Sequence, residues 1–141
     1  MSMGTVIRPE ISEQSPYYIS RHRYYELKHF CLQYPEWEIR LKSIDGLGSK
    51  SAIAGEYVNA GKTSDPTAMY AEARLYLSRR MRMVTDAAEK SCGYLAEAMV
   101  ESVTLGIPYE KLAARGTVHC GKDLWYAAYR RFFWVLDKLR E

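Results

Sequence analysis

Cysteine is scarce in this sequence, and it is not arranged for a disulfide framework or a zinc site. The three cysteines, Cys31, Cys92 and Cys120, are odd in number, far apart and form no Cys-x-x-Cys pair. Small secreted domains and zinc ribbons depend on such pairs. We therefore expect reduced thiols and neither a metal nor a cofactor.

Long apolar runs are missing as well. No stretch reaches the roughly 20 apolar residues that a membrane-spanning helix needs. The opening segment, MSMGTVIRPEISEQ, has neither the basic start nor the apolar centre of a secretory signal peptide. We expect a cytoplasmic protein without a membrane partner.

Charge of one sign is in only slight excess. Lysine and arginine number 20 against 17 aspartates and glutamates, which gives a formal net charge of +3. Such a balance favours a polyanionic partner without establishing one. Hydrophobic residues make up 48% of the 141 residues, so the chain is long and apolar enough for one folded domain, or one domain with an arm.

Patterns that carry catalysis are also lacking. The sequence has no P-loop and no dinucleotide-binding glycine fingerprint. His22 and His29 would lie about 10 Å apart along a helix, too far to share a metal without a third element. His119 and Cys120 are adjacent in sequence, whereas catalytic Cys/His pairs are assembled in space. We expect the protein not to be an enzyme.

Apolar residues at steps of three and four predict an all-α fold, a helical bundle that begins with a helical hairpin over residues 1–44. The first helix should begin at the N-cap Ser20 and end at Tyr34, because the residue before a proline leaves the helical region. The second should begin at Pro35. The predicted buried faces are Tyr24, Leu27, Cys31 and Tyr34 in the first helix, and Trp37, Leu41 and Ile44 in the second.

Residues 45–65 predict a linker, because they hold four of the nine glycines and no helical period persists through them. A helical domain is expected over residues 66–141. Its long first helix should begin at Asp65 as N-cap and Pro66, and a second helix, YLAEAMVESVTL, should end at Gly106. The predicted inner face of the long helix is Met69, Ala73, Tyr76 or Leu77, Val84 and Ala88, and its outer face carries Arg74, Arg79, Arg80 and Arg82.

The last part of the chain, residues 107–141, predicts a helix-turn-helix. Pro108 should open a short helix that Gly116 ends, and the turn TVHCGK leads to a longer helix from Lys122 to Arg140. A short helix, a turn with glycine and a longer helix are typical of proteins that place the second helix in the DNA major groove.

The last helix is predicted to have two faces. The buried stripe is expected to consist of Leu124, Ala128, Phe132, Val135, Leu136 and Leu139, broadened by Trp125 and Tyr129. The opposite side is expected to carry Lys122, Tyr126, Arg130, Phe133 and Asp137.

This second side could read DNA, because the start of such a helix reaches base edges while flanking cations hold phosphates. Arg130 or Lys122 could donate to guanine, and Tyr126 or Trp125 could pack against a sugar or a thymine methyl. Arg131 lies about 100° round the helix from Arg130, so a structural ion pair is equally expected for it. The candidate DNA-binding residues are Lys111, Arg115, Lys122, Asp123, Trp125, Tyr126, Tyr129, Arg130 and Arg131.

Two segments resemble phage and prophage proteins of low-GC Gram-positive bacteria. YYISRHRYYELKHFCLQYPEW is similar to a segment that recurs in them, and the ending VTLGIPYEKLAARGTVHCGKDLWYAAYRRFFWVLDKLRE resembles RinA/ArpU-type phage transcription regulators, which resemble region 4 of sigma factors. By resemblance, Tyr109, Glu110, Leu112 and Ala113 match the positioning helix and residues 121–131 the recognition helix. The turn is longer than in that pattern.

The resemblance implies a transcription regulator in a bacterial host, with double-stranded DNA as partner, RNA polymerase as a candidate second partner, and a homo-oligomer as its expected state. Two alternatives stay open. The same motif serves small-terminase-like components that package phage DNA. A helical interaction protein that does not bind DNA would instead contact RNA polymerase or a phage structural protein through Phe133, Trp134 and Tyr126.

Overall fold

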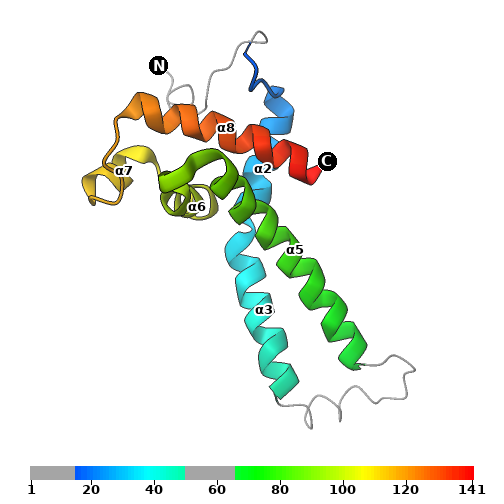
Figure 1. Cartoon of the computed structure of the whole chain (residues 1–141). Helices are drawn as coiled ribbons and strands as arrows, with labels where there is room; N and C mark the ends of the chain where they lie inside the picture. The colour runs from blue at the N-terminus through cyan, green and yellow to red at the C-terminus, as the bar shows by residue number, and fades with distance from the viewer. Residues whose placement is uncertain (1–14, 50–65) are drawn as a thin grey trace. The chain divides into compact units, whose positions relative to one another are not determined.

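The predicted all-α fold class is confirmed in the part of the chain that the structure, a computed structural model, describes: residues 15–49 and 66–141, which contain no strand (Figure 1). None of the helices in these ranges is long and apolar enough to cross a membrane. The elements are α2 (Arg21–Leu32), α3 (Tyr34–Ser49), α5 (Pro66–Cys92), the 3-10 helix η1 (Gly93–Leu95), α6 (Ala96–Leu105), α7 (Tyr109–Ala114) and α8 (Lys122–Arg140).

The described residues divide into two compact units. The first combines residues 15–33 with 83–141, and the second contains residues 34–49 and 66–82. This division differs from the predicted boundaries at residues 44 and 65, because α2 contacts α6 and α8 of the C-terminal half. The predicted linker lies mostly outside the described residues, and its first part, residues 45–49, continues helix α3.

The ends of α2 follow from local chemistry. The side-chain oxygen of Ser20 accepts a hydrogen bond from the backbone N–H of Arg23 at 3.2 Å, which is the predicted N-cap. The helix ends at Leu32 rather than Tyr34, with Gln33 as its C-cap. Helix α3 begins at Tyr34, so Pro35 lies in its first turn, where its missing N–H is tolerated.

Helix α5 begins at Pro66 as predicted, while the predicted N-cap Asp65 lies outside the described residues. Val84 and Ala88, which belong to the first unit, are buried as expected. The prediction is wrong for Met69 of the second unit, which is exposed. The helical period alone therefore does not decide which apolar residues of a long helix are covered.

Two glycines shape the chain between α5 and α7. Gly93 has a φ of 57° at the start of η1, and Gly106 has a φ of 72° at the end of α6, values that favour glycine. The N–H groups of Gly106 and Ile107 both donate to the carbonyl of Ser102, at 2.9 and 3.1 Å. Gly106 is thus the predicted C-terminal cap of α6.

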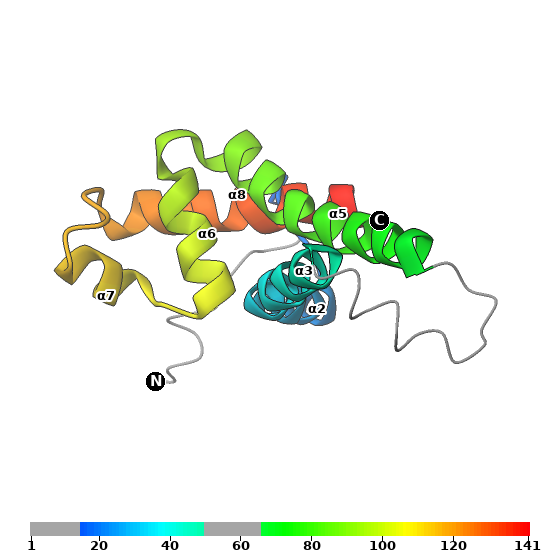
Figure 2. The same cartoon turned by 90° about the horizontal axis from the view of Figure 1, so that it is seen from below.

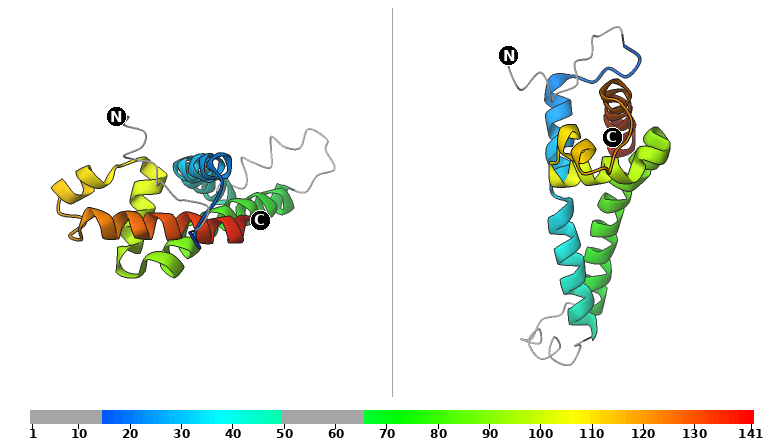
Figure 3. Two further views of the ribbon diagram at one scale, coloured as in Figure 1. Left: turned by 90° about the horizontal axis from the view of Figure 1, so that it is seen from above. Right: turned by 90° about the vertical axis from the view of Figure 1, so that its left-hand side faces the viewer.

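Helix α8 forms the centre of the first unit. It crosses α2, and α6 and α7 lie along one of its sides (Figures 1, 2 and 3). Its buried residues are Trp125, Ala128, Tyr129, Phe132, Phe133 and Leu136. They pack in a core that includes Tyr24, Leu27, Phe30 and Cys31 of α2 and Met99 and Val103 of α6.

This inner face is rotated from the predicted one. Ala128, Phe132 and Leu136 are buried as expected, but Leu124 is 47% exposed and Val135 and Leu139 are only half-buried. Phe133, which was expected on the outer side, is 1% exposed. Aromatic rings decide the rotation, because the Phe133 ring packs edge-on against Tyr24 at 5.1 Å and large rings bury the most apolar area.

Two polar contacts accompany this packing of α2 on α8. The Arg23 side chain donates from Nε to Asp137 Oδ1 at 2.6 Å, and both side chains are part-buried. The hydroxyl groups of Tyr24 and Tyr129 lie 2.9 Å apart in a buried hydrogen bond. Asp137, predicted on the outer side, thus has a structural partner within the unit.

The rotation of α8 can be tested with two leucines of the same helix. Leu136 is fully buried, so Leu136→Ala should lower the free energy of unfolding by about 2–5 kcal/mol. Leu124→Ala, at an exposed position, should change it by less than about 0.5 kcal/mol. Urea unfolding followed by circular dichroism measures both. Equal losses for the two variants would contradict the rotation.

The buried Tyr129 predicts that the protein is less stable in alkali. Burial raises the pKa of the Tyr129 hydroxyl well above its ordinary value, and the neighbouring Tyr24 raises it further. A raised pKa stabilises the folded state at any pH below the unfolded-state value, and this contribution is lost as the pH rises above about 10. Tyr129→Phe removes the group that titrates.

The free energy of unfolding, measured between about pH 8 and about pH 11, should therefore fall less steeply in Tyr129→Phe than in the unaltered chain. At the lower pH this variant should lose about 1 kcal/mol with its hydrogen bond. Tyr94→Phe is the matched control, because Tyr94 is 80% exposed. If the free energy of unfolding falls equally steeply with pH in all three proteins, Tyr129 is not the cause of the lost stability in alkali.

Candidate nucleic-acid interface

The predicted short and long helices of the helix-turn-helix are both present, as α7 and α8. Pro108 is the N-cap of α7, and Gly116, with a φ of 80°, follows its end. Leu112 is fully buried and anchors α7 in the core of the first unit. Residues 115–121 join it to α8, whose N-cap is Gly121.

The long turn is held by specific contacts. The N–H of Thr117 donates to the carbonyl of Leu112 at 3.0 Å, and the side chain of Val118 is buried. The hydroxyl of Tyr109 donates to the carbonyl of Cys120 at 2.8 Å. The start of α7 and the start of α8 are therefore tied together across the turn.

Two of the predicted DNA-binding cations have carboxylate partners. Lys122 lies 3.3 Å from Glu110, and Arg115 lies 2.6 Å from Glu101. About one third or more of each of the four side chains is exposed. Each pair therefore contributes about 1 kcal/mol or less to the free energy of unfolding. Sequence reasoning missed both ion pairs, because each pair joins different elements and leaves no spacing pattern.

The remaining cations of the motif lie at the surface. Lys111 of α7 is exposed, and Arg130 of α8 is half-exposed. Neither has an ion pair with another residue in the described ranges. Asp123, in the first turn of α8, is exposed as well. The outer side of the first turns of α8 therefore carries charge of both signs.

Three aromatic candidates are less available than predicted. Trp125 is 1% exposed and Tyr129 is buried, so both belong to the core and are withdrawn as groups that contact DNA. Tyr126 is half-buried, with its ring 6.4 Å from Tyr109. Burial raises the pKa of the Tyr126 hydroxyl, and the nearby charge of Glu110 adds to the shift.

Arg131 has a structural contact. Its Nε donates to the carbonyl of Ser91 at 3.2 Å. Ser91 lies in the last turn of α5, where a cation interacts favourably with the helix dipole. Arg131 therefore has a structural role, but its partner is a backbone carbonyl and not the carboxylate of the predicted ion pair.

Comparison with known proteins found no matching family model, no matching curated protein and no matching solved structure. The site must therefore be interpreted from its own residues. Within the described ranges, no group of three or more His, Cys, Asp or Glu residues could hold a metal ion.

The glycine after α7 offers a test of how the motif is built. Gly116→Ala should cost about 1–2 kcal/mol of folding free energy, because an alanine side chain is strained at positive φ. Gly116→Asn should cost less, since asparagine tolerates this conformation. Thermal unfolding of the two variants measures the difference. An alanine variant as stable as the asparagine variant would show that position 116 does not need the left-handed conformation.

Proposed function

We propose that this chain is a non-enzymatic DNA-binding protein, a phage or prophage transcription regulator that binds double-stranded DNA through α7 and α8. The observation that carries the proposal is the outer side of α8, where Asp123 and Arg130 lie within about two turns of the amino terminus of the helix. Helix-turn-helix proteins contact base edges from this part of the second helix.

The chemistry of these groups suits base and phosphate contacts. The Arg130 guanidinium could donate twice to guanine, and the Asp123 carboxylate could accept from the amino group of cytosine. Lys111, Arg115 and Lys122 add exposed cations to the motif. The backbone N–H groups at the start of α8 favour a phosphate as well.

The carboxylates Glu101 and Glu110 set a condition on binding. A phosphate that approaches Arg115 or Lys122 must displace a carboxylate from the cation. The displacement costs little, because an exposed pair contributes about 1 kcal/mol or less. The same carboxylates lower the affinity for any DNA through repulsion, so the proposal implies that contacts to bases contribute a substantial share of specific binding.

A second proposal, the helical interaction protein, has support of its own in the second unit. Ile39 of α3 and Met69, Leu75 and Tyr76 of α5 are exposed. Met69 and Tyr76 are seven residues apart and therefore share one side of α5, and exposed apolar side chains that share a surface mark contact sites. The residues first expected for this role are less suitable, because Phe133 is buried and the ring of Trp134 lies 5.5 Å from that of Tyr17.

Charge variants of the full chain test the DNA-binding proposal. Arg130→Gln and Lys111→Gln should each weaken binding to duplex DNA about 5- to 20-fold, and the Lys111 change should lower the salt slope by about one. Glu110→Gln should strengthen binding, because it removes a repulsive charge and releases Lys122. Fluorescence anisotropy with duplexes selected from a random pool measures the affinities.

Lys90→Gln is the matched control, since it removes one charge from an exposed residue of α5 outside the motif. Its affinity should stay close to that of the unaltered chain. If DNA does not bind at low salt, or if the control loses as much affinity as Arg130→Gln, the DNA-binding proposal fails. Tight binding of a protein partner that survives Arg130→Gln would then favour the interaction protein.

A further inference from the structure

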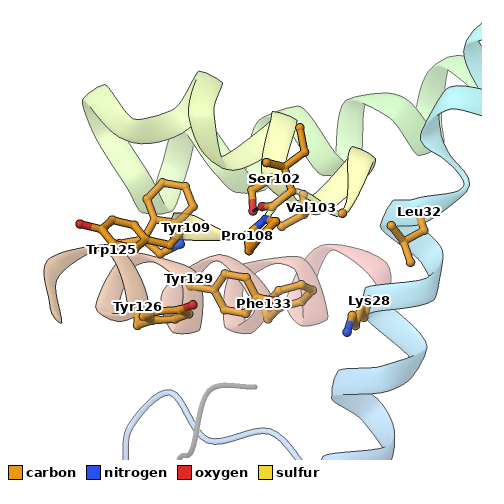
Figure 4. Close-up of a pocket in the computed structure, with 12 residues that line it drawn as sticks. Lys28, Leu32, Ser102, Val103, Pro108, Tyr109, Trp125, Tyr126, Tyr129 and Phe133 are labelled. Atoms are coloured by element: carbon orange, nitrogen blue, oxygen red, sulfur yellow. Dashed lines mark hydrogen bonds between the residues drawn. The ribbon is translucent and has the colours of Figure 1, made fainter. Parts of the chain in front are cut away.

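The first unit contains a cavity of about 220 Å³ beside the helix-turn-helix. Figure 4 shows its walls, which come from α2, from the corner between α6 and α7, and from α8. The lining residues that matter most are Lys28 and Leu32 of α2, Val103 and Pro108 at the corner, and Tyr126 and Phe133 of α8.

The walls are mainly apolar and aromatic. Along α8 the rings of Tyr126, Tyr129 and Phe133 follow one another, with centroids 5.8 Å and 5.0 Å apart. Leu32 and Val103 supply aliphatic surface to the same cavity. An apolar cavity of about 150 Å³ holds benzene, whereas drug-sized ligands occupy about 300 Å³ or more. This cavity therefore has room for one aromatic ring with a small substituent.

The polar groups of the lining separate into two kinds. The hydroxyls of Ser102, Tyr109 and Tyr129 are already hydrogen-bonded, to the carbonyl of Ile107, the carbonyl of Cys120 and the hydroxyl of Tyr24. The Lys28 ammonium and the Tyr126 hydroxyl make no hydrogen bond or ion pair with other described residues, and the nearest interaction of Lys28 is with the Tyr25 ring at 6.0 Å.

The lining therefore carries one positive charge, that of Lys28, and no negative charge. No aspartate or glutamate lines the cavity, so a bound ligand meets the Lys28 cation without a carboxylate in the lining. The charge of Glu110, which is not a lining residue, acts on the Tyr126 hydroxyl. Figure 4 shows Lys28 at one end of the row of rings. A cation beside a row of aromatic rings complements a planar ligand that carries a negative group at its edge.

We propose that this cavity binds a small aromatic carboxylate, with the ring against Tyr126 and Phe133 and the carboxylate at Lys28. The site is separate from the outer side of α8 that is proposed to contact DNA. Its ligand would touch α2, the corner before α7 and the inner side of α8 at once.

The test uses the full chain and two compounds of nearly equal shape, benzoate and benzamide, which differ in charge. Titration by NMR, with the ring signals of Tyr126 and Phe133 as readout, gives both affinities. Benzoate should bind about tenfold more tightly than benzamide, because a hydrogen bond to a charged group is stronger than a neutral one. Saturating benzoate should shift the cavity signals and leave those of the exposed Tyr94 unchanged.

Lys28→Met keeps most of the apolar stem and removes the cation, so it should abolish the preference for benzoate. Lys90→Met, at an exposed residue outside the cavity, should preserve the preference. Leu32→Phe narrows the cavity and should weaken both compounds, with thermal unfolding as the check on folding. Equal affinity for the two compounds, an unchanged preference in Lys28→Met, or no shift at Tyr126 and Phe133 would each overturn the proposal.

Discussion

The packing of α2 against α8 is the contact on which the rest of the first unit depends. Tyr24 meets both Tyr129 and Phe133, through a hydroxyl pair at 2.9 Å and an edge-on ring contact at 5.1 Å. These contacts fix the rotation of α8 about its axis. That rotation places Arg130 at the surface, turns Phe133 inward, and makes the inner side of α8 one wall of the cavity. The proposed DNA contacts and the proposed ligand site are thus neighbouring sides of one packed helix.

The electrostatics of the motif follow from pairs that form between elements. Glu101 of α6 and Glu110 of α7 neutralise Arg115 and Lys122, so the motif is far less basic than its count of lysines and arginines suggests. Strong binding to any polyanion is not expected of such a surface. A DNA-binding role would instead depend on complementary contacts from a few residues of α8, with Arg130 foremost among them.

Much of the fold could be predicted from local signals in the sequence. Ser20 acts through its side-chain oxygen and Gly106 and Gly116 through their backbone conformation, in each case within a few residues, and the helix ends they predict agree with the structure. The covered side of α8 could not be predicted in the same way, because large apolar side chains surround most of this helix. Tyr24, about a hundred residues away in the chain, selects Phe133 over Leu124. The ion pairs of Arg115 with Glu101 and of Lys122 with Glu110 could not be predicted either, because the two residues of each pair lie on different elements and at no helical spacing.

The most direct measurement is an NMR titration of the full chain with a selected DNA duplex, followed through the backbone amide signals of all helices. If α8 reads DNA from its outer side, the changes should concentrate at Lys111 in α7 and at residues 122–130 of α8. The signals of α3 and of the start of α5 should stay in place. Changes confined to α3 and α5, or no changes at saturating duplex, would contradict a DNA-binding role for the helix-turn-helix.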